Sequence, residues 1–189
     1  MSGFSRTKLV GTVPCTSQCM RTNRPERLET FDYVGLHQYF LTFCTYDRDR
    51  LFVKADAVDL VRTQIARAGV ERSIEVIAYC FMPDHVHLLV EGKREDSDCR
   101  VFISRAKQYS GFHYKATHGR RLWQRYGYER VLRNDEATVS VARYIIENPV
   151  RARLVKCVAD YQFSGSSVYT VEQLLDAVQL RSKWYSGSA

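Results

Sequence analysis

Two histidines separated by a single residue stand in the apolar stretch HVHLLVEG, residues 85–92. Side chains two apart in a β-strand point to the same face, so His85 and His87 project together while Val86 and Leu88 point away from them. Two neighbouring imidazoles can chelate one divalent cation, here beside a turn where a substrate could reach it. The other interpretation is a pair of sheet histidines hydrogen-bonded to their neighbours, and the spacing leaves both open.

A tyrosine and an asparagine offer matching chemistry further along the chain. Tyr144 and Asn148 lie four residues apart in a stretch with helical periodicity, so they share one face of the helix. The amide oxygen of Asn148 can ligate a cation, and the Tyr144 hydroxyl would then lie near that cation, poised as a nucleophile. Alternatively, Tyr144 is a core aromatic residue and Asn148 caps the helix before Pro149.

Positive charge is concentrated in one block of the chain. Of the 28 lysines and arginines behind the net charge of +7, nine lie between residues 100 and 134, together with one acid, Glu129. Such side chains neutralise phosphates, and the aromatic rings interleaved with them can stack on unpaired bases, so we predict nucleic-acid binding. The alternative is a solvated basic face above core aromatics. The predicted phosphate contacts are Arg120, Arg121 and Arg125, and the predicted stacking platforms are Trp123 and Tyr126, with core packing as the alternative for Trp123.

The totals are those of a single globular domain, with 189 residues of which 45% are hydrophobic. No apolar run reaches the roughly 18 residues of a membrane span, and the first residues lack the apolar stretch of a secretory signal. We therefore expect a cytoplasmic protein with no membrane partner. The six cysteines include no CxxC pair; Cys15 and Cys19 could be half of a zinc site, but no second half follows, so we expect reduced thiols.

The first half of the chain predicts the elements that position the histidines. Alternation and aromatic content in QYFLTFCTY indicate a strand over about 38–46. Apolar residues at helical spacing predict a helix over 54–69, which Gly69 ends. Strands are predicted over 74–82 and 85–92, joined as a hairpin.

The second half predicts the elements that position the tyrosine and the basic block. The prediction is a helix over 99–116, a strand over 122–133, a helix capped by Asn134 or Asp135 that stops before Pro149, a loop over 150–169 and an amphipathic helix over 170–184. The order from residue 38 is β-α-β-β-α-β. This order predicts an α+β fold with a ferredoxin-like antiparallel sheet, to which a catalytic helix and a C-terminal helix are added.

Several segments resemble one family. MPDHVHLL is similar to the HUH motif of single-tyrosine transposases, in which two histidines flank an apolar residue, and the later segments resemble the REP-associated tyrosine transposases. The segments are MPDHVHLL (82–89), LWQRYGYERVLRN (122–134), YIIENPVRARLV (144–155) and DYQFSGSS (160–167). The resemblance covers about 38–168. With it, the chain divides into a polar N-terminal arm (1–30), an HUH transposase-like catalytic domain (31–168) and a C-terminal helix and tail (169–189).

The resemblance implies an enzyme that cuts and rejoins single-stranded DNA, often beside a hairpin, through a 5′-phosphotyrosine intermediate. His85 and His87 match the family's metal histidines, Tyr144 matches the nucleophile, and Asn148 falls where the family places a third, polar ligand. Tyr109, also on a predicted helix, is a rival nucleophile. The resemblance further implies Mg²⁺ or Mn²⁺ as cofactor, single-stranded or hairpin DNA as partner, a place at the bacterial nucleoid, and a monomer or homodimer.

Two other functions remain open at this level. A protein of the same ancestry with an idle catalytic set would bind a DNA or RNA hairpin without cutting it. A metal-dependent phosphodiesterase would cleave with an activated water, would form no covalent adduct, and would not need Tyr144.

Overall fold

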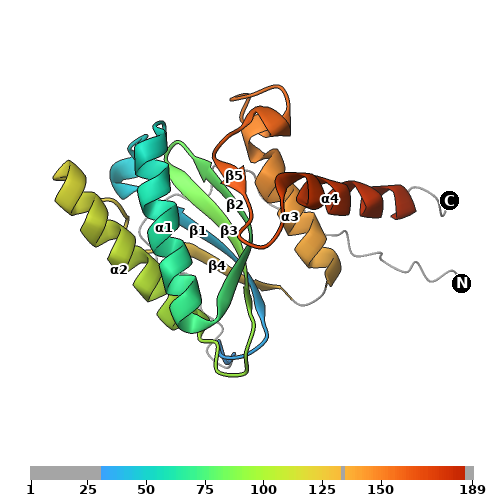
Figure 1. Cartoon of the computed structure of the whole chain (residues 1–189), viewed down its shortest axis with the longest axis horizontal. Coiled ribbons are helices and arrows are strands. Elements are labelled where there is room, and N and C mark those ends of the chain that lie inside the picture. Colours follow the sequence, from blue (N-terminus) through green and yellow to red (C-terminus); the bar gives the residue numbers. More distant parts are fainter. Residues whose placement is uncertain (1–30, 133–134, 186–189) are drawn as a thin grey trace, which may run out of the picture.

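A five-stranded antiparallel sheet forms the middle layer of the computed structural model, which describes residues 31–132 and 135–185 (Figure 1). The strand order in the sheet is β4-β1-β3-β2-β5. The strands are β1 (Gln38–Cys44), β2 (Ile74–Met82), β3 (His85–Gly92), β4 (Tyr128–Leu132) and β5 (Ser164–Gly165). The predicted arm at 1–30, with Cys15 and Cys19, and residues Arg133 and Asn134 lie outside the described residues.

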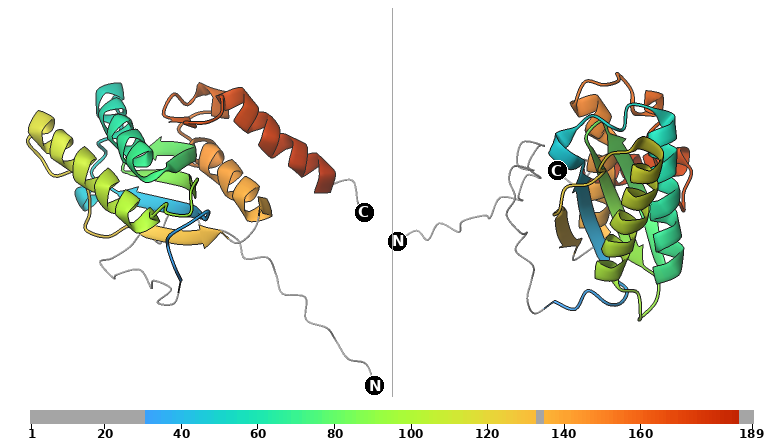
Figure 2. Two further views of the ribbon diagram at one scale, coloured as in Figure 1. Left: turned by 60° about the horizontal axis from the view of Figure 1, so that its bottom comes forward. Right: turned by 90° about the vertical axis from the view of Figure 1, so that its left-hand side faces the viewer.

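Helices cover both faces of this sheet. α1 (Ala55–Arg72) and α2 (Cys99–His118) lie side by side on one face, as the views in Figure 2 show. α3 (Asp135–Arg151) crosses the other face, and α4 (Val171–Tyr185) packs against α3 (Figure 1). Within the described residues the molecule therefore has five strands and four α-helices, which confirms the α+β class and the predicted ferredoxin-like order with two added helices.

Each face of the sheet carries its own hydrophobic core, because the side chains of a strand alternate between the two faces. Val86 and Leu88 of β3 belong to the core beneath α1 and α2, together with Phe102. Leu89 belongs to the core beneath α3, together with Ile145. His85 and His87 share the face of Leu89, so the alternation of one strand places both imidazoles on the side where α3 lies.

The predicted end of the first helix is wrong by three residues. α1 continues past Gly69 to Arg72, and Ser73 ends it in the left-handed conformation, with φ 51°. Gly69 serves a different purpose, because a Cβ at this position would lie 2.6 Å from the carbonyl oxygen of Ile74. Glycine thus permits the close approach of α1 to the first residue of β2.

The predicted stop before Pro149 is also wrong, since α3 runs through Pro149 to Arg151. Proline removes one amide donor, but its carbonyl still accepts a bond from the amide of Leu154 at 2.8 Å. The amide of Arg153 bonds to the carbonyl of Val150 at 2.9 Å, and Arg153 has φ 58°. This pair of bonds is a Schellman motif, which satisfies the last carbonyls of the helix beyond the proline.

Three further boundaries differ from the predictions. The first strand ends at Cys44 rather than at 46, because a short 3₁₀ turn follows at Tyr46–Arg48. Of the described part of the predicted strand over 122–133, Tyr128–Leu132 is β4 and residues 122–127 form an irregular segment. The predicted loop over 150–169 contains a second 3₁₀ turn and β5, whose two residues are defined by pairing with β2 rather than by any local pattern.

Candidate active site

The two histidines are the first and third residues of β3, next to the turn from β2, and their ring nitrogens face each other. His85 Nε2 and His87 Nε2 are 3.1 Å apart, and the ring centroids are 4.6 Å apart. Both side chains are buried. The structure therefore joins the pair on one face, as the strand alternation predicts.

The other nitrogen of each ring is held by a neighbour. His85 Nδ1 lies 2.6 Å from Asp84 Oδ1, and His87 Nδ1 lies 2.8 Å from Thr42 Oγ1. An ionised carboxylate only accepts hydrogen bonds, so His85 donates from Nδ1, and in the neutral ring Nε2 is the atom that keeps a lone pair. The Thr42 hydroxyl can donate or accept, so it can serve either tautomer of His87. The two Nε2 atoms are themselves within hydrogen-bond distance, with one of them as the donor. With a cation between them and the proton of His87 on Nδ1, both Nε2 atoms would offer a lone pair to the same point.

Burial, more than the charges around the pair, keeps His87 neutral. Burial lowers the pKa of His87 well below its usual value, and the nearby His85 and Arg48 act in the same direction. Burial would raise the pKa of Asp84, but its hydrogen bond with His85 and the charge of Arg48 outweigh that effect and lower it. Arg48 Nε lies 2.9 Å from Asp84 Oδ2. A neutral His87 and an ionised Asp84 are the states that a pair of metal-binding histidines requires.

The donor set fits a small divalent cation. Two ligands at right angles with bonds of about 2.1 Å are separated by about 3 Å, which matches the distance between the two Nε2 atoms. Among the residues that the structure describes, no group of three or more His, Cys, Asp or Glu side chains could hold a metal ion. A third protein ligand from these residues would therefore be of another type, such as the amide oxygen of an asparagine.

Tyr144 of α3 lies next to this pair. Its ring centroid is 5.8 Å from that of His87 and 5.9 Å from that of Phe40, which in turn packs on His87. The guanidinium of Arg151 lies 5.3 Å from the Tyr144 ring centroid. Tyr144 is 6% exposed, so the tyrosine forms part of the site and also part of the core beneath α3.

Asn148 lies one turn further along α3 and is 3% exposed. Its Nδ2 donates to the backbone carbonyl of Tyr144 at 2.8 Å. The amide nitrogen is therefore bound within the helix, and the amide oxygen is the atom that a cation would use.

Tyr109, the rival nucleophile, lies in another part of the molecule. It belongs to α2, and its hydroxyl donates to Glu71 at the end of α1 at 2.8 Å. The guanidinium of Arg67 lies 4.4 Å from its ring centroid. α1 and α2 cover the sheet face opposite to the histidines, so the structure groups Tyr144 and not Tyr109 with the histidine pair.

The predicted DNA contacts divide into exposed and buried residues. Arg121 and Arg125 are exposed, and the Arg125 guanidinium lies 5.3 Å from the ring centroid of the partly exposed Tyr126. Arg120 is exposed but forms an ion pair with Asp49 at 2.5 Å. Trp123 is 5% exposed, and its Nε1 donates to Ser110 at 2.8 Å. The structure thus shows the core alternative for Trp123, whose ring also packs against Phe43 and Phe52.

The family profile described as "Transposase IS200 like" matches residues 33–148, which include the histidine pair, Tyr144 and Asn148. The chain belongs to the IS200-like transposase family. Membership of a transposase family implies an enzyme and is consistent with a metal-using nuclease.

Relatives of this IS200-like transposase carry names that agree with the family. A Haemophilus influenzae protein named as a REP-associated tyrosine transposase is 26% identical over 148 residues, which cover 67% of this chain and 78% of the relative. The REP-associated tyrosine transposase of Escherichia coli K12 is 29% identical over 105 residues, covering 56% and 62%. The solved structure of a REP-associated tyrosine transposase bound to a REP hairpin aligns with TM-score 0.62 and 24% identity over 77% of this chain and 82% of that one, which shows the shared fold.

Some residues around the site of this IS200-like transposase were missed by the sequence analysis. Tyr128 pairs with Thr42 across the sheet, is 46% exposed, and packs edge-on against Phe40 at 5.9 Å. Arg130 pairs with Phe40 and is exposed on the same face of β4. Only the register between β1 and β4 reveals this proximity, and no local pattern encodes it. Within residues 31–132 and 135–185, no helix is both long and apolar enough to cross a membrane.

Proposed function

We propose that this chain cuts and rejoins single-stranded DNA through a covalent 5′-phosphotyrosine at Tyr144. The observation that carries the proposal is the convergence on one face of the sheet of the facing Nε2 atoms of His85 and His87 with the ring of Tyr144, 5.8 Å from that of His87. The family membership supports the same activity.

The residues that would hold a divalent cation are His85 and His87 through Nε2 and Asn148 through its amide oxygen. A cation held there would supply Lewis-acid polarisation of the scissile phosphate. Imidazole and amide donors suit Mn²⁺ well, whereas Mg²⁺ usually takes an all-oxygen shell but is abundant, so Mn²⁺ and Mg²⁺ are the cations to test. Asp84 and Thr42 keep the imidazoles in the orientation that this role requires.

The reaction exchanges one phosphodiester for another. The Tyr144 oxygen attacks phosphorus in line with the bond to the 3′ oxygen, that bond breaks, and the 3′ oxygen leaves as a hydroxyl after gaining a proton while the phenol loses one. The 5′ phosphate stays on the tyrosine. Because the new bond is also a phosphodiester, a 3′-hydroxyl can reverse the step without ATP. The sequence accordingly contains no G-x-x-x-x-G-K-[ST] nucleotide loop.

Hairpin DNA is the proposed partner. Arg121, Arg125 and Tyr126 stand in the segment that bonds to the end of β1 next to the histidines, where Gln124 N donates to Cys44 O at 3.0 Å. The related transposase bound to a REP hairpin supports a hairpin as the structured part of the substrate. Exposed arginines would contact its phosphates, and Tyr126 would stack on an unpaired base.

The experiment is an adduct assay. The full chain is incubated with end-labelled hairpin oligonucleotides, taken from the DNA that flanks the gene, in Mn²⁺ or Mg²⁺, and resolved on a denaturing gel. We expect a slowly migrating protein–DNA adduct that disappears in Tyr144→Phe and falls at least a hundredfold in His85→Ala. Tyr109→Phe is the matched control, because it removes the same hydroxyl from the rival nucleophile and should leave the adduct unchanged.

The other outcomes separate the competing functions. Cleavage at the wild-type rate in Tyr144→Phe would overturn the tyrosine mechanism and favour a phosphodiesterase that uses activated water. A mobility shift without cleavage on every flanking hairpin would favour a hairpin-binding protein.

A further inference from the structure

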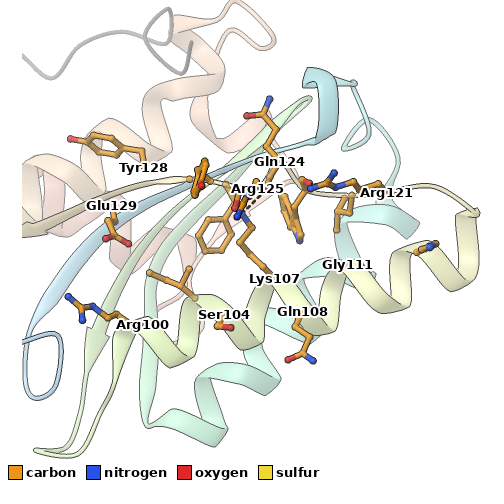
Figure 3. Close-up of a pocket in the computed structure, with 17 residues that line it drawn as sticks. Arg100, Ser104, Lys107, Gln108, Gly111, Arg121, Gln124, Arg125, Tyr128 and Glu129 are labelled. Atoms are coloured by element: carbon orange, nitrogen blue, oxygen red, sulfur yellow. Dashed lines mark hydrogen bonds between the residues drawn. The ribbon is translucent and has the colours of Figure 1, made fainter. Parts of the chain in front are cut away.

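A pocket of about 750 Å³ lies on the sheet face opposite to the histidines (Figure 3). One wall is α2, along which Arg100, Ser104 and Lys107 follow one another, and the other wall is the segment 121–129. The pocket does not include the histidine pair, Tyr144 or Asn148, but its lining contains Arg121, Arg125 and Tyr126, the proposed hairpin contacts. Its volume is within the range of sites that hold a small organic molecule or one nucleotide.

The lining of the pocket is strongly basic and partly aromatic. Glu129 is its one carboxylate among the described residues. Its five cations are Arg100, Lys107, Lys115, Arg121 and Arg125. Rings of Phe43, Trp123 and Tyr126 form apolar parts of the wall. A ligand that carries negative charge and a flat, partly apolar group matches this lining, and a nucleotide has both.

Lys107 holds the two walls of the pocket together and does not face the ligand with a free ammonium group. Its Nζ lies 2.8 Å from the carbonyl oxygen of Gln124 and 3.2 Å from that of Arg125, so the ammonium ties the segment 121–129 to α2. Burial lowers the pKa of Lys107 to about 8, with a smaller lowering effect of Arg121. The cations at the rim, Lys115, Arg121 and Arg125, are exposed and can meet a phosphate.

The segment that forms the wall also loops out of the sheet edge. Thr45 pairs with Trp123 and Thr42 pairs with Tyr128, so three steps along β1 correspond to five steps along the segment. The two additional residues form a bulge that carries Arg125 and Tyr126 outward. Gly127 makes this bulge possible, because a Cβ there would lie 2.7 Å from the carbonyl oxygen of Thr42.

Only one strand separates the pocket from the candidate active site. Thr42 bonds to His87 on one face of β1, whereas the next residue, Phe43, lines the pocket on the other face. Figure 3 shows the side chains of Glu129 and Tyr128 on opposite sides of β4, with that of Glu129 on the side of α2, although both residues contribute to the pocket lining. A DNA strand that crosses this edge past the bulge would therefore touch both faces.

We propose that this pocket binds one unpaired nucleotide of the DNA, with its phosphate at Lys115, Arg121 and Arg125 and its base against Tyr126. The proposal rests on the proposed function for the identity of DNA as the partner. Two parts of a hairpin substrate could supply such a nucleotide, namely the single-stranded flank and a base extruded from the stem. Both present the same chemistry to the pocket, and the experiment distinguishes them.

The test uses variants from the two walls. Tyr126→Ala removes the proposed stacking ring, and Ser104→Phe places a bulky side chain at the pocket from an exposed position of α2. Ala116→Phe adds the same group at an exposed position of α2 outside the pocket and serves as the matched control. All three are made in the Tyr144→Phe chain, so that bound DNA stays uncut, and circular dichroism checks their folding.

Each variant is titrated by fluorescence anisotropy with a hairpin and its two flanks, in which one nucleotide at a time is replaced by an abasic unit. We expect Tyr126→Ala and Ser104→Phe each to weaken binding of the intact hairpin about tenfold, and Ala116→Phe to leave it unchanged. At one nucleotide, the abasic unit should weaken binding about tenfold when the pocket is unsubstituted. In Tyr126→Ala or Ser104→Phe, the same abasic unit should have almost no effect on binding. That position in a flank or in the stem identifies the source of the nucleotide.

Unchanged affinity in Ser104→Phe, or abasic costs that simply add to the variant costs at every position, would overturn the pocket assignment. A different result would overturn the proposed function, namely the absence of any protein–DNA adduct with the unsubstituted chain. If the losses of affinity from the abasic unit and from the pocket variants are coupled, that is, not additive, at one nucleotide but no adduct forms, the pocket assignment stands and the tyrosine mechanism is rejected. Adduct formation without coupling would do the reverse.

Discussion

The hydroxyl of Thr42 is the hydrogen-bond partner that allows His87 to keep its proton on Nδ1 and to offer Nε2 to a cation. Groups that hold the second nitrogen of a metal-binding histidine raise metal affinity by about 10- to 100-fold. We therefore expect Thr42→Val, which keeps the branched shape but not the hydroxyl, to weaken Mn²⁺ binding by roughly that factor. Isothermal titration calorimetry on the full chain measures it.

Thr42→Ser is the control for this prediction, since it retains the hydroxyl and should bind Mn²⁺ with an affinity close to that of the unsubstituted chain. Equal affinities for the valine and serine variants would show that the threonine hydroxyl does not orient His87. A loss in both would point to packing around the missing methyl group instead.

Local sequence patterns predict the histidine pair of the site, but they do not predict the distant residues that orient it. The shared face of His85 and His87 follows from the two-residue period of a strand, and Asp84 is adjacent in sequence. Thr42 lies more than forty positions away, and its proximity to His87 depends on the register of β1 against β3. The burial of Trp123 has the same origin, because the Ser110 acceptor comes from a different element.

At the scale of elements, the end of α3 depends on one residue in an unfavourable conformation. Arg153 occupies the left-handed region at φ 58° as the C′ residue of the Schellman motif, a place where glycine is free of the penalty that a Cβ brings. Its side chain is exposed. We expect Arg153→Gly to raise the free energy of unfolding by about 1 kcal/mol, measured by urea denaturation.

Arg153→Ala is the matched comparison, because it removes the arginine side chain but keeps the Cβ in the left-handed region. It should leave the free energy of unfolding within about 0.5 kcal/mol of the unsubstituted value. If the alanine variant gained as much as the glycine variant, the charge of Arg153 rather than its backbone conformation would be the cause.

The elements that sequence patterns missed are those defined by long-range pairing. The hairpin over 74–82 and 85–92 matches β2 and β3, because alternation within each strand and the Pro83 turn are local signals. The strand prediction over 122–133 fails in its first part, where two residues beyond the register of β1 loop out of the sheet. An aromatic and Val-rich composition is the same for a strand and for such a bulge, so composition could not separate them.

At the scale of the whole molecule, the two proposed sites lie on opposite faces of the sheet. One face carries the histidine pair and Tyr144 beneath α3, and the other carries the basic pocket beside α2. Both meet at the β1–β4 edge, where the segment 121–129 is fixed to the body by Lys107. The stability of the fold and the shape of the pocket wall therefore depend on the same half-buried ammonium group.

This ammonium gives the stability of the molecule a defined pH dependence. Burial lowers the pKa of Lys107 to about 8 in the folded protein, whereas an unfolded lysine has a pKa of about 10.4. Between these values the unfolded chain binds more protons than the folded chain, so the free energy of unfolding rises with pH. The contribution of Lys107 should increase by about 1 kcal/mol from pH 7 to pH 9.

Lys107→Met isolates this contribution, because methionine fills a similar space and does not titrate. In paired urea denaturations at pH 7 and pH 9, we expect the unsubstituted chain to gain about 1 kcal/mol relative to the methionine variant, since the other titrating groups are common to both. Equal changes in the two proteins would mean that the Gln124 and Arg125 carbonyls stabilise the ammonium as well as water does. The wall of the pocket would then keep its lysine charged throughout this pH range, and its attachment to α2 would not depend on pH.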